Sequence, residues 1–315
     1  MKNVFCRIMV CLLLLCSGLD CFAVQKQTVR YAEKDGTDLM LDHYISDSAA
    51  GQRGCVIFVF GGGFAAGARN SKWYVSFFEW LCDEGYDVFS IDYRLGLSKK
   101  YNDYGWKKGA FGLMQRCVKA IDWAIDDLFS ATSYILSRAD EWNIDKTRIL
   151  ACGSSAGAIT CLTAEYRMCS GTAQENVLPK DFNYAGIISM AGAIQSMKGH
   201  PKWKSEPCPL MMFHGNADRN VPYKHMGFFG KGMWGSKYIA RQMQKNDWNY
   251  YFYDARYRDH ALASEPMTRN REQIREFLYN SVERKHPFHV HRVIDDQKYP
   301  KRKTHFSLAT YLRQK

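Results

Sequence analysis

A glycine-flanked serine is the residue of this sequence best suited to nucleophilic chemistry. Gly153-Ser154-Ser155-Ala156-Gly157 fits the pattern G-x-S-x-G, with Ser155 at its centre. The pattern follows an apolar run, Arg148–Cys152, and precedes a helical stretch, so it predicts a sharp strand–turn–helix that exposes the Ser155 hydroxyl. The flanking glycines let the strand and the helix approach closely. We therefore expect Ser155 to act as a nucleophile and its neighbour Ser154 to be structural.

A run of three glycines gives a second chemical signal. Gly61-Gly62-Gly63 follows another apolar run, Cys55–Phe60. During acyl transfer, negative charge develops on the carbonyl oxygen, and backbone N–H groups aimed at that oxygen stabilise it. Glycines allow the backbone an approach that side chains would block. A phosphate-binding loop is disfavoured because no Lys-Ser/Thr pair follows the glycines.

The elements that must position these residues follow an alternating order of strands and helices. The apolar runs expected to form strands are Thr28–Ala32, Asp38–Ile45, Cys55–Phe60, Asp87–Asp92, Arg148–Cys152, Tyr184–Ala191, Pro209–His214 and Tyr250–Asp254. The stretches expected to be helical are 72–83, 112–141, the residues after Gly157, 235–246 and Ser264–Val282. The first two strands read as an antiparallel pair that turns at Asp35-Gly36. The alternation predicts an α/β fold with a mostly parallel central sheet of about eight strands and helices on both faces.

Four motifs occur in a characteristic order along residues 28 to 282. They are Phe60-Gly61-Gly62-Gly63-Phe64, Asp92-Tyr93-Arg94-Leu95, the Ser155 pattern, and His214-Gly215-Asn216-Ala217-Asp218 followed by Val221-Pro222. Together they resemble the α/β-hydrolase superfamily, and among its members the hormone-sensitive-lipase-like and bacterial carbohydrate-esterase branches. The resemblance implies a serine carboxylic-ester hydrolase that works through an acyl-serine intermediate and uses no cofactor.

The resemblance also implies the acid and the base that a serine nucleophile needs. In the chain order serine, acid, histidine, the family places its acid after the strand that here ends at His214, which indicates Asp218. It places its base after the last strand, which indicates His260. Asp254 and Asp259 remain alternatives for the acid. The side chain of Asp259 would reach the adjacent His260 ring with difficulty.

By the same resemblance, the backbone N–H groups of Gly62, Gly63 and Ala156 form the oxyanion hole. The family usually has a histidine where this sequence has Phe60. That histidine normally braces the glycine loop, so the sequence leaves open what supports the loop here.

An aromatic stretch follows the candidate acid and is a candidate for substrate binding. Between Pro222 and Tyr238 it contains Phe228, Phe229 and Trp234, and Phe64 lies beside the glycine loop. These side chains either line an acyl or sugar pocket or belong to a packed surface insertion. The sequence leaves both interpretations open.

Residues 1–23 read as a secretory signal peptide. Lys2 and Arg7 precede a nine-residue apolar run, Ile8–Cys16, which is shorter than the roughly 20 residues of a membrane span. Cys21-Phe22-Ala23 resembles a cleavage site, so we expect a protein exported to the periplasm or the medium, with no transmembrane segment. The expected domains are the leader (1–23), a catalytic domain (24–283) and a basic C-terminal tail (284–315).

The basic character of the chain is concentrated in that tail. The formal net charge is +11, and residues 284–315 hold nine Lys or Arg against two Asp. The tail is interpreted as a solvated, partly ordered terminus, with contact to an anionic lipid, nucleic acid or acidic glycan as the alternative. The catalytic domain carries no basic surface of the kind that nucleic-acid binding requires.

Cysteine and histidine spacing gives no metal site. Seven of the 11 cysteines follow the leader, with no CxxC pair and no zinc pattern, and the four histidines of the tail do not match a metal site either. An odd number of cysteines leaves at least one free thiol or an intermolecular bond, and one disulfide is possible.

The leading function predicted from the sequence is a secreted esterase acting on short acyl or feruloyl esters of carbohydrate, with either a small-molecule or a polysaccharide ester as its substrate. One alternative is a serine peptidase of the prolyl-oligopeptidase type, which shares the order of the catalytic residues. Another is a non-catalytic binding protein on a hydrolase fold. The sequence does not determine the acyl group, the alcohol or the oligomeric state.

Overall fold

The computed structural model describes residues 24–46, 51–101, 109–173, 177–228, 230–302 and 304, with the backbone alone at 109–111 and 228. The expected leader and Phe229 lie outside these residues, as does the side chain of Phe228. Within the described ranges, no helix has the length and apolar character needed to cross a membrane.

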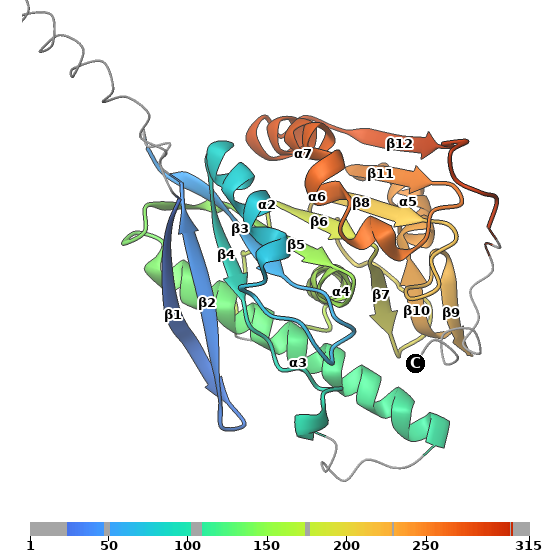
Figure 1. Ribbon diagram of the computed structural model, residues 1–315, viewed down its shortest axis with the longest axis horizontal. Coiled ribbons are helices and arrows are strands. Elements are labelled where there is room, and N and C mark those ends of the chain that lie inside the picture. The colour runs from blue at the N-terminus through green and yellow to red at the C-terminus, as the bar shows by residue number, and fades with distance from the viewer. Residues whose placement is uncertain are drawn as a thin grey trace, which may run out of the picture.

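A nine-stranded sheet, in the order β1-β2-β4-β3-β5-β6-β8-β11-β12, forms the centre of the molecule (Figure 1). Its strands are β1 (Gln25–Lys34), β2 (Thr37–Ile45), β3 (Arg53–Val59), β4 (Tyr86–Ile91), β5 (Ile144–Ser154), β6 (Gly186–Met190), β8 (Leu210–Gly215), β11 (Tyr250–Ala255) and β12 (His289–Ile294). β2 pairs antiparallel with β1 and β4, and the pairings from β4 to β12 are parallel. The predicted α/β fold with a mostly parallel sheet is confirmed, and the parallel strands bring their carboxyl ends to one edge.

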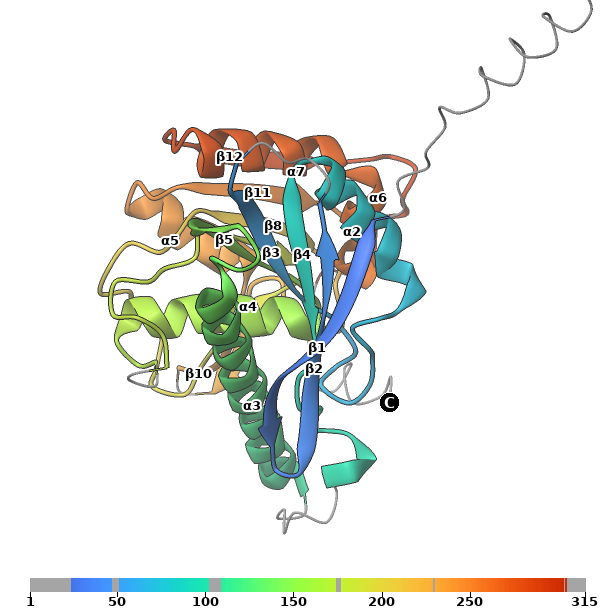
Figure 2. The same ribbon diagram turned by 90° about the vertical axis from the view of Figure 1, so that its left-hand side faces the viewer.

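Helices cover both faces of this sheet (Figure 2). They are α2 (Lys72–Asp83), α3 (Gly109–Arg138), α4 (Ala156–Ser170), α5 (Ser236–Lys245), α6 (Pro266–Arg269) and α7 (Arg271–Phe277), with the short turns η1 (Lys99–Tyr101), η2 (His260–Ala263) and η3 (Leu278–Glu283). α3, α4 and α5 lie on one face, and α2, α6 and α7 on the other. Strands such as β3, β4 and β8 are mostly apolar and are buried along nearly their whole length, because helices cover both of their faces.

A second, three-stranded sheet lies beside the main one (Figure 1). It consists of β7 (Ala193–Ser196), β10 (Lys231–Gly235) and β9 (His225–Phe228), paired antiparallel. β9 and β10 lie close together at Gly232 in β10, which has a φ of +151° and where a Cβ would lie 2.1 Å from the Met226 carbonyl oxygen of β9. Much of the aromatic stretch after the candidate acid therefore belongs to an antiparallel sheet.

The expected tail, 284–315, contributes a strand to the main sheet. β12 pairs parallel with β11 along its whole length, from Tyr250 opposite His289 to Ala255 opposite Ile294. Its side chains are mostly exposed or half-buried, so backbone hydrogen bonds to the sheet edge hold it there rather than apolar burial. Residues 289–294 of the expected tail thus form an ordered edge strand whose side chains remain exposed or half-buried.

The closing helix also differs from the prediction. The segment Ser264–Val282 forms α6, α7 and the π-helical turn η3 instead of one helix. Asn270, between α6 and α7, has a φ of −121° and a ψ of +27°, which lies outside helical geometry.

Candidate active site

The Ser155 turn has the strained geometry that its sequence pattern predicts. Ser155 stands between β5 and α4 with a φ of 51° and a ψ of −113°, and its N–H donates to the Met190 carbonyl at 2.8 Å. A Cβ on Gly157 would lie 1.9 Å from the Val59 carbonyl oxygen, and one on Gly153 would lie 2.3 Å from the Gly157 carbonyl carbon. Both flanking positions therefore require glycine, and the turn projects the serine from the end of the strand.

Two further loops at the same edge carry Asp218 and His260. Asp218 lies three residues after β8, and its Oδ1 accepts N–H groups from Asn220 at 2.7 Å and Val221 at 3.0 Å. His260 begins η2 after β11, where the Asp259 side chain caps the turn by accepting the Ala261 N–H at 3.1 Å. Since β5, β8 and β11 belong to the parallel part of the sheet, their carboxyl ends bring these loops together.

Ser155, His260 and Asp218 form a continuous hydrogen-bonded relay. Ser155 Oγ lies 2.8 Å from His260 Nε2, and His260 Nδ1 lies 2.7 Å from Asp218 Oδ2. The His260 side chain is 22% exposed, whereas that of Asp218 is fully buried. With Nδ1 donating to the carboxylate, Nε2 is left as an acceptor for the serine proton. The arrangement can deprotonate the serine hydroxyl in a site open to a ligand.

The Asp218 carboxyl is held in its ionised form. Burial raises the pKa of this carboxyl, but hydrogen bonds from His214 and His260 outweigh burial and bring the pKa well below the ordinary value. His214 is itself fully buried, with Nε2 3.4 Å from Asp218 Oδ2 and Nδ1 2.9 Å from the Ser236 hydroxyl. His214 thus packs against Asp218 and stabilises its carboxylate, and its ring bonds to Ser236 rather than to Ser155.

The two alternative acids have other partners. Asp254 accepts hydrogen bonds from the Tyr223 hydroxyl at 2.6 Å and from Lys237 at 2.9 Å. Asp259 caps η2 and forms an ion pair with Arg302. Among the described residues, Asp218 is the carboxylate that bonds to the His260 ring.

The glycine loop presents backbone N–H groups toward solvent beside the serine turn. Gly62 and Gly63 are exposed, with φ values of +128° and +63°. The Gly62 carbonyl accepts the N–H groups of Ala65 and Ala66, both at 3.1 Å, whereas the N–H groups of Gly62 and Gly63 meet no acceptor within the described residues. A Cβ on Gly62 would lie 2.0 Å from the Ala66 carbonyl oxygen, so this tight turn requires glycine. Ala156, the third expected donor, is the first residue of α4.

Phe60 and Tyr93 support the glycine loop at the place where the family usually has a histidine. The Phe60 ring is buried 4.6 Å from that of Tyr93, and the Tyr93 hydroxyl donates to the Phe60 carbonyl at 3.0 Å. At the far end of the loop, the Leu97 N–H donates to the Phe64 carbonyl at 2.9 Å. The loop is thus fixed at both ends by the segment that follows β4.

The two candidate substrate-binding aromatics whose side chains the structure describes are buried. Phe64 is 6% exposed and packs edge-on against Tyr93, and Trp234 is 2% exposed and packs against His200 and Tyr238. Neither lines the cavity beside His260. Phe229 and the side chain of Phe228 lie outside the described residues, so their role stays a prediction.

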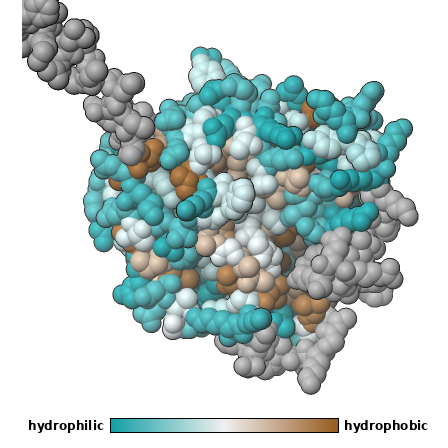
Figure 3. Space-filling model, viewed as in Figure 1, coloured by the Kyte–Doolittle hydropathy of each residue, from teal (hydrophilic) through white to brown (hydrophobic). Residues whose placement is uncertain are grey.

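The molecule has a cavity of about 660 Å³ directly beside the relay. His260 forms part of its wall together with Arg219, Asn220, Asp259 and Arg302. The middle of the face seen in Figure 1, over α4, carries weakly polar and apolar side chains within a hydrophilic rim (Figure 3). A ligand in this cavity would meet charged groups at the histidine side of the site.

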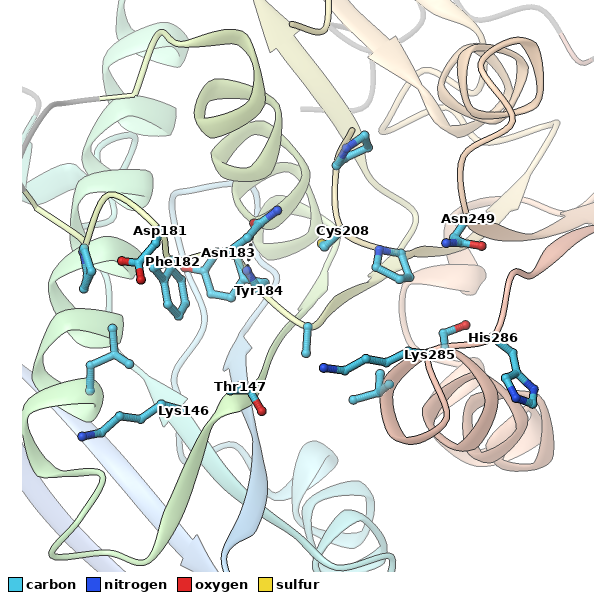
Figure 4. A pocket seen from close by; sticks show the side chains of 17 residues that line it. Lys146, Thr147, Asp181, Phe182, Asn183, Tyr184, Cys208, Asn249, Lys285 and His286 are labelled. Atoms are coloured by element: carbon cyan, nitrogen blue, oxygen red, sulfur yellow. Dashed lines mark hydrogen bonds between the residues drawn. The ribbon is translucent and has the colours of Figure 1, made fainter. Parts of the chain in front are cut away.

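A second cavity, of about 630 Å³, lies at the opposite edge of the sheet (Figure 4). Thr147 at the start of β5, Ala185 before β6 and Asn249 before β11 line it, as do Lys285 and His286 after η3. These positions mark the amino ends of the parallel strands. Because Ser155 and His260 lie at the carboxyl ends, we assign the chemistry to the cavity beside His260.

The described residues contain neither a metal-binding cluster nor a disulfide. No group of three or more His, Cys, Asp or Glu in the described ranges is arranged to hold a metal ion. None of the seven cysteines in these ranges forms a disulfide.

Sequence reasoning missed several residues around the relay. Arg219 follows Asp218 directly, and its place in the acid loop was the one available signal for its position in the cavity. Arg302 comes from the basic segment after β12, and no local pattern connects it with His260. The contact of Tyr93 with Phe60 also depends on the packing of distant segments.

Comparison with known proteins identifies the fold. No family model matches the chain. An uncharacterised protein of Escherichia coli K12, YfhR, is 25% identical over 210 residues, which cover 63% of this chain and 65% of YfhR. The chain thus matches about two thirds of the length of this relative.

Solved structures of esterase 2 from Thermogutta terrifontis are similar over most of the molecule. The apo form has a TM-score of 0.57 at 19% identity, with 81% of this chain and 94% of that chain covered. The propionate-bound form has a TM-score of 0.57 at 20% identity, with 81% of this chain and 93% of that chain covered. The form phosphorylated by paraoxon has a TM-score of 0.56 at 19% identity, with 80% of this chain and 93% of that chain covered. The chain therefore has the α/β-hydrolase fold, as predicted.

Proposed function

We propose that the protein is a carboxylic-ester hydrolase that works through an acyl-serine intermediate. The observation that carries this proposal is the relay from Ser155 Oγ through His260 to Asp218, with contacts of 2.8 and 2.7 Å. The glycine loop beside it offers the N–H groups that acyl transfer needs. The fold supports the proposal, since the similar solved structures are those of an esterase.

In the first half of the reaction, Ser155 Oγ attacks the carbonyl carbon of the ester while His260 Nε2 takes the hydroxyl proton. The carbonyl π electrons move onto oxygen and form a tetrahedral oxyanion. When this intermediate collapses, the bond to the alcohol oxygen breaks, and His260 returns the proton to the leaving alkoxide. The products are the free alcohol and an acylated Ser155.

In the second half, water takes the place of the alcohol. His260 Nε2 removes a proton from water, the hydroxide attacks the acyl carbon, and collapse of the second tetrahedral intermediate releases the carboxylic acid. The proton on His260 then returns to Ser155 Oγ, so the enzyme is regenerated. No cofactor or metal is required to balance either half.

The N–H groups of Gly62, Gly63 and Ala156 would stabilise both oxyanions. The first two N–H groups have no acceptor within the described residues and lie in a loop held by Tyr93. Donors fixed before the reaction need no reorganisation when charge develops, and each is worth about 10² to 10³ in rate. Asp218, kept ionised by its hydrogen bonds, would stabilise the imidazolium that forms between the two proton transfers.

For the substrate, we propose short acyl or feruloyl esters of carbohydrate, met outside the cytoplasm after export directed by residues 1–23. The proposal follows the motifs shared with the carbohydrate-esterase branch and the basic and apolar pattern of the leader. Turnover of acetylated xylan, feruloylated arabinoxylan and p-nitrophenyl acetate, compared side by side, tests it. Faster cleavage of dipeptide amides than of any ester would favour the peptidase alternative.

The test of the reaction itself is the variant Ser155→Ala. Hydrolysis of p-nitrophenyl acetate should fall by at least about 10³-fold, because the nucleophile is gone while the loop donors remain. Ser137→Ala is the matched control, since Ser137 is an exposed hydroxyl near the end of α3, toward the opposite edge of the sheet. Equal turnover by the wild type and a folded Ser155→Ala protein would refute the proposal.

A further inference from the structure

The cavity beside His260 has a positively charged wall. Arg219 and Arg302 both line it, and Asp259 is the one carboxylate among its lining residues. Asp259 is already paired with Arg302. Arg219 is exposed and has no carboxylate partner within the described residues. The wall thus keeps one uncompensated positive charge next to the candidate base.

The C-terminal segment is anchored where it forms part of this wall. After β12 it turns at Asp296, whose carbonyl accepts the Tyr299 N–H at 3.0 Å (Figure 1). The Arg258 guanidinium lies 3.8 Å from the centre of the Tyr299 ring, and Arg269 donates to the Tyr299 hydroxyl at 3.3 Å. Arg302 is thereby brought to Asp259. The basic segment is a built part of the site and not a detached tail.

The reaction geometry decides which part of a substrate meets this wall. His260 Nε2 must lie within hydrogen-bond reach of the alcohol oxygen when it protonates the leaving group. The oxyanion donors of the glycine loop belong to a different part of the site and are not among the residues that line this cavity. A group attached to the alcohol, on the side of His260, therefore enters the cavity lined by Arg219 and Arg302.

We propose that the preferred substrate is an ester whose alcohol portion carries a carboxylate, which Arg219 recognises beside the Arg302–Asp259 ion pair. This inference rests on the proposed function, because it names the substrate class of the same site. A guanidinium presents two parallel N–H donors to a carboxylate, which gives geometric selectivity as well as charge attraction. Because the wall is open to solvent, salt screens the attraction.

The test compares two acetate esters that differ in one charged group, 4-acetoxybenzoate and 4-acetoxybenzamide. The ratio of their kcat/KM values is measured for the wild type, for Arg219→Gln and for Arg138→Gln. Arg138 ends α3, which leads to the amino end of β5 at the opposite edge of the sheet, so it is the matched control. Comparing each variant with the wild type cancels the intrinsic reactivity of the two esters.

At low ionic strength, we expect Arg219→Gln to lower the ratio of kcat/KM for 4-acetoxybenzoate to kcat/KM for 4-acetoxybenzamide by about tenfold. In 0.5 M NaCl, the ratios of the wild type and the variant should move closer together. Arg138→Gln should leave the ratio unchanged. If both esters are hydrolysed and their ratio is the same in the wild type and in Arg219→Gln, this inference is wrong, whereas the proposed esterase function still stands. If the wild type hydrolyses neither ester nor p-nitrophenyl acetate, the proposed function itself fails.

Discussion

Replacing Asp218 by asparagine is the most informative single change in the relay. Asp218 Oδ1 accepts two backbone N–H groups, from Asn220 and Val221, and these require an oxygen at that position. In Asp218→Asn the amide oxygen would therefore keep the Oδ1 position and the NH₂ group would point at His260 Nδ1. An NH₂ donor facing Nδ1 favours the tautomer with its proton on Nε2.

The expected loss follows from that change of tautomer. A protonated Nε2 donates to Ser155 Oγ and can no longer accept its proton. In the variant, the imidazolium that forms on His260 during the reaction would also lack the carboxylate that stabilises it in the wild type. In the serine–histidine–aspartate template the same change lowers kcat by about 10⁴, which corresponds to about 5.5 kcal/mol of transition-state stabilisation. We expect a loss of that order for Asp218→Asn, with the folded structure retained.

The assay is kcat/KM for p-nitrophenyl acetate, with Asp254→Asn as the control. Asp254 was an alternative acid, but it bonds to Tyr223 and Lys237 and not to His260. We expect the control to keep activity within about threefold at a temperature where circular dichroism shows it folded. If Asp218→Asn retains more than about a tenth of wild-type kcat/KM while Asp254→Asn loses most of it, the assignment of the acid is wrong.

Two further predictions concern the turn and the pH dependence. Gly157→Ala should lower the free energy of unfolding in urea by about 3 kcal/mol or more, because the new Cβ would lie 1.9 Å from a backbone oxygen. Gly36→Ala is the control: its Cβ would meet no atom within 4 Å, so it should cost only about 1 kcal/mol for the positive φ. Equal losses in the two variants would contradict the steric argument. Because the pKa of Asp218 is lowered on folding, its carboxylate stabilises the folded chain above the ordinary Asp value of about 3.9 and loses that effect as the pH falls below it. The difference in free energy of unfolding between the wild type and Asp218→Asn should therefore narrow from pH 7 to pH 3, and a constant difference would argue against an ionised, hydrogen-bonded Asp218.

The central strands and the serine turn were predictable because their signals are local. Runs such as Cys55–Phe60 and Pro209–Phe213 are continuously apolar, which is typical of strands buried on both faces. The glycines around Ser155 are required by contacts with their own neighbouring strand and helix. The positions of Asp218 and His260 came from the resemblance to the α/β-hydrolases. They agree with the structure because parallel strands bring the loops after β5, β8 and β11 to one edge.

No local sequence pattern predicts the parts of the structure that depend on backbone pairing or on packing between distant segments. β12, with the sequence HVHRVI, is neither continuously apolar nor regularly alternating, and it lies in a basic segment. Its pairing with the edge of β11 makes it a strand. The small second sheet is short and rich in glycine, so its strands have no clear periodicity. The meeting of Arg302 with Asp259 depends on the anchoring of Tyr299, which no spacing in the sequence records.

Covalent labelling of Ser155 tests the central claim most directly. The folded wild type is treated with a fluorophosphonate, digested and mapped by mass spectrometry, beside Ser155→Ala and Ser137→Ala. The relay predicts one adduct, on Ser155, in the wild type and in Ser137→Ala, accompanied by loss of p-nitrophenyl acetate hydrolysis, and no adduct in Ser155→Ala. An unlabelled Ser155 in a protein that still hydrolyses the ester would contradict it.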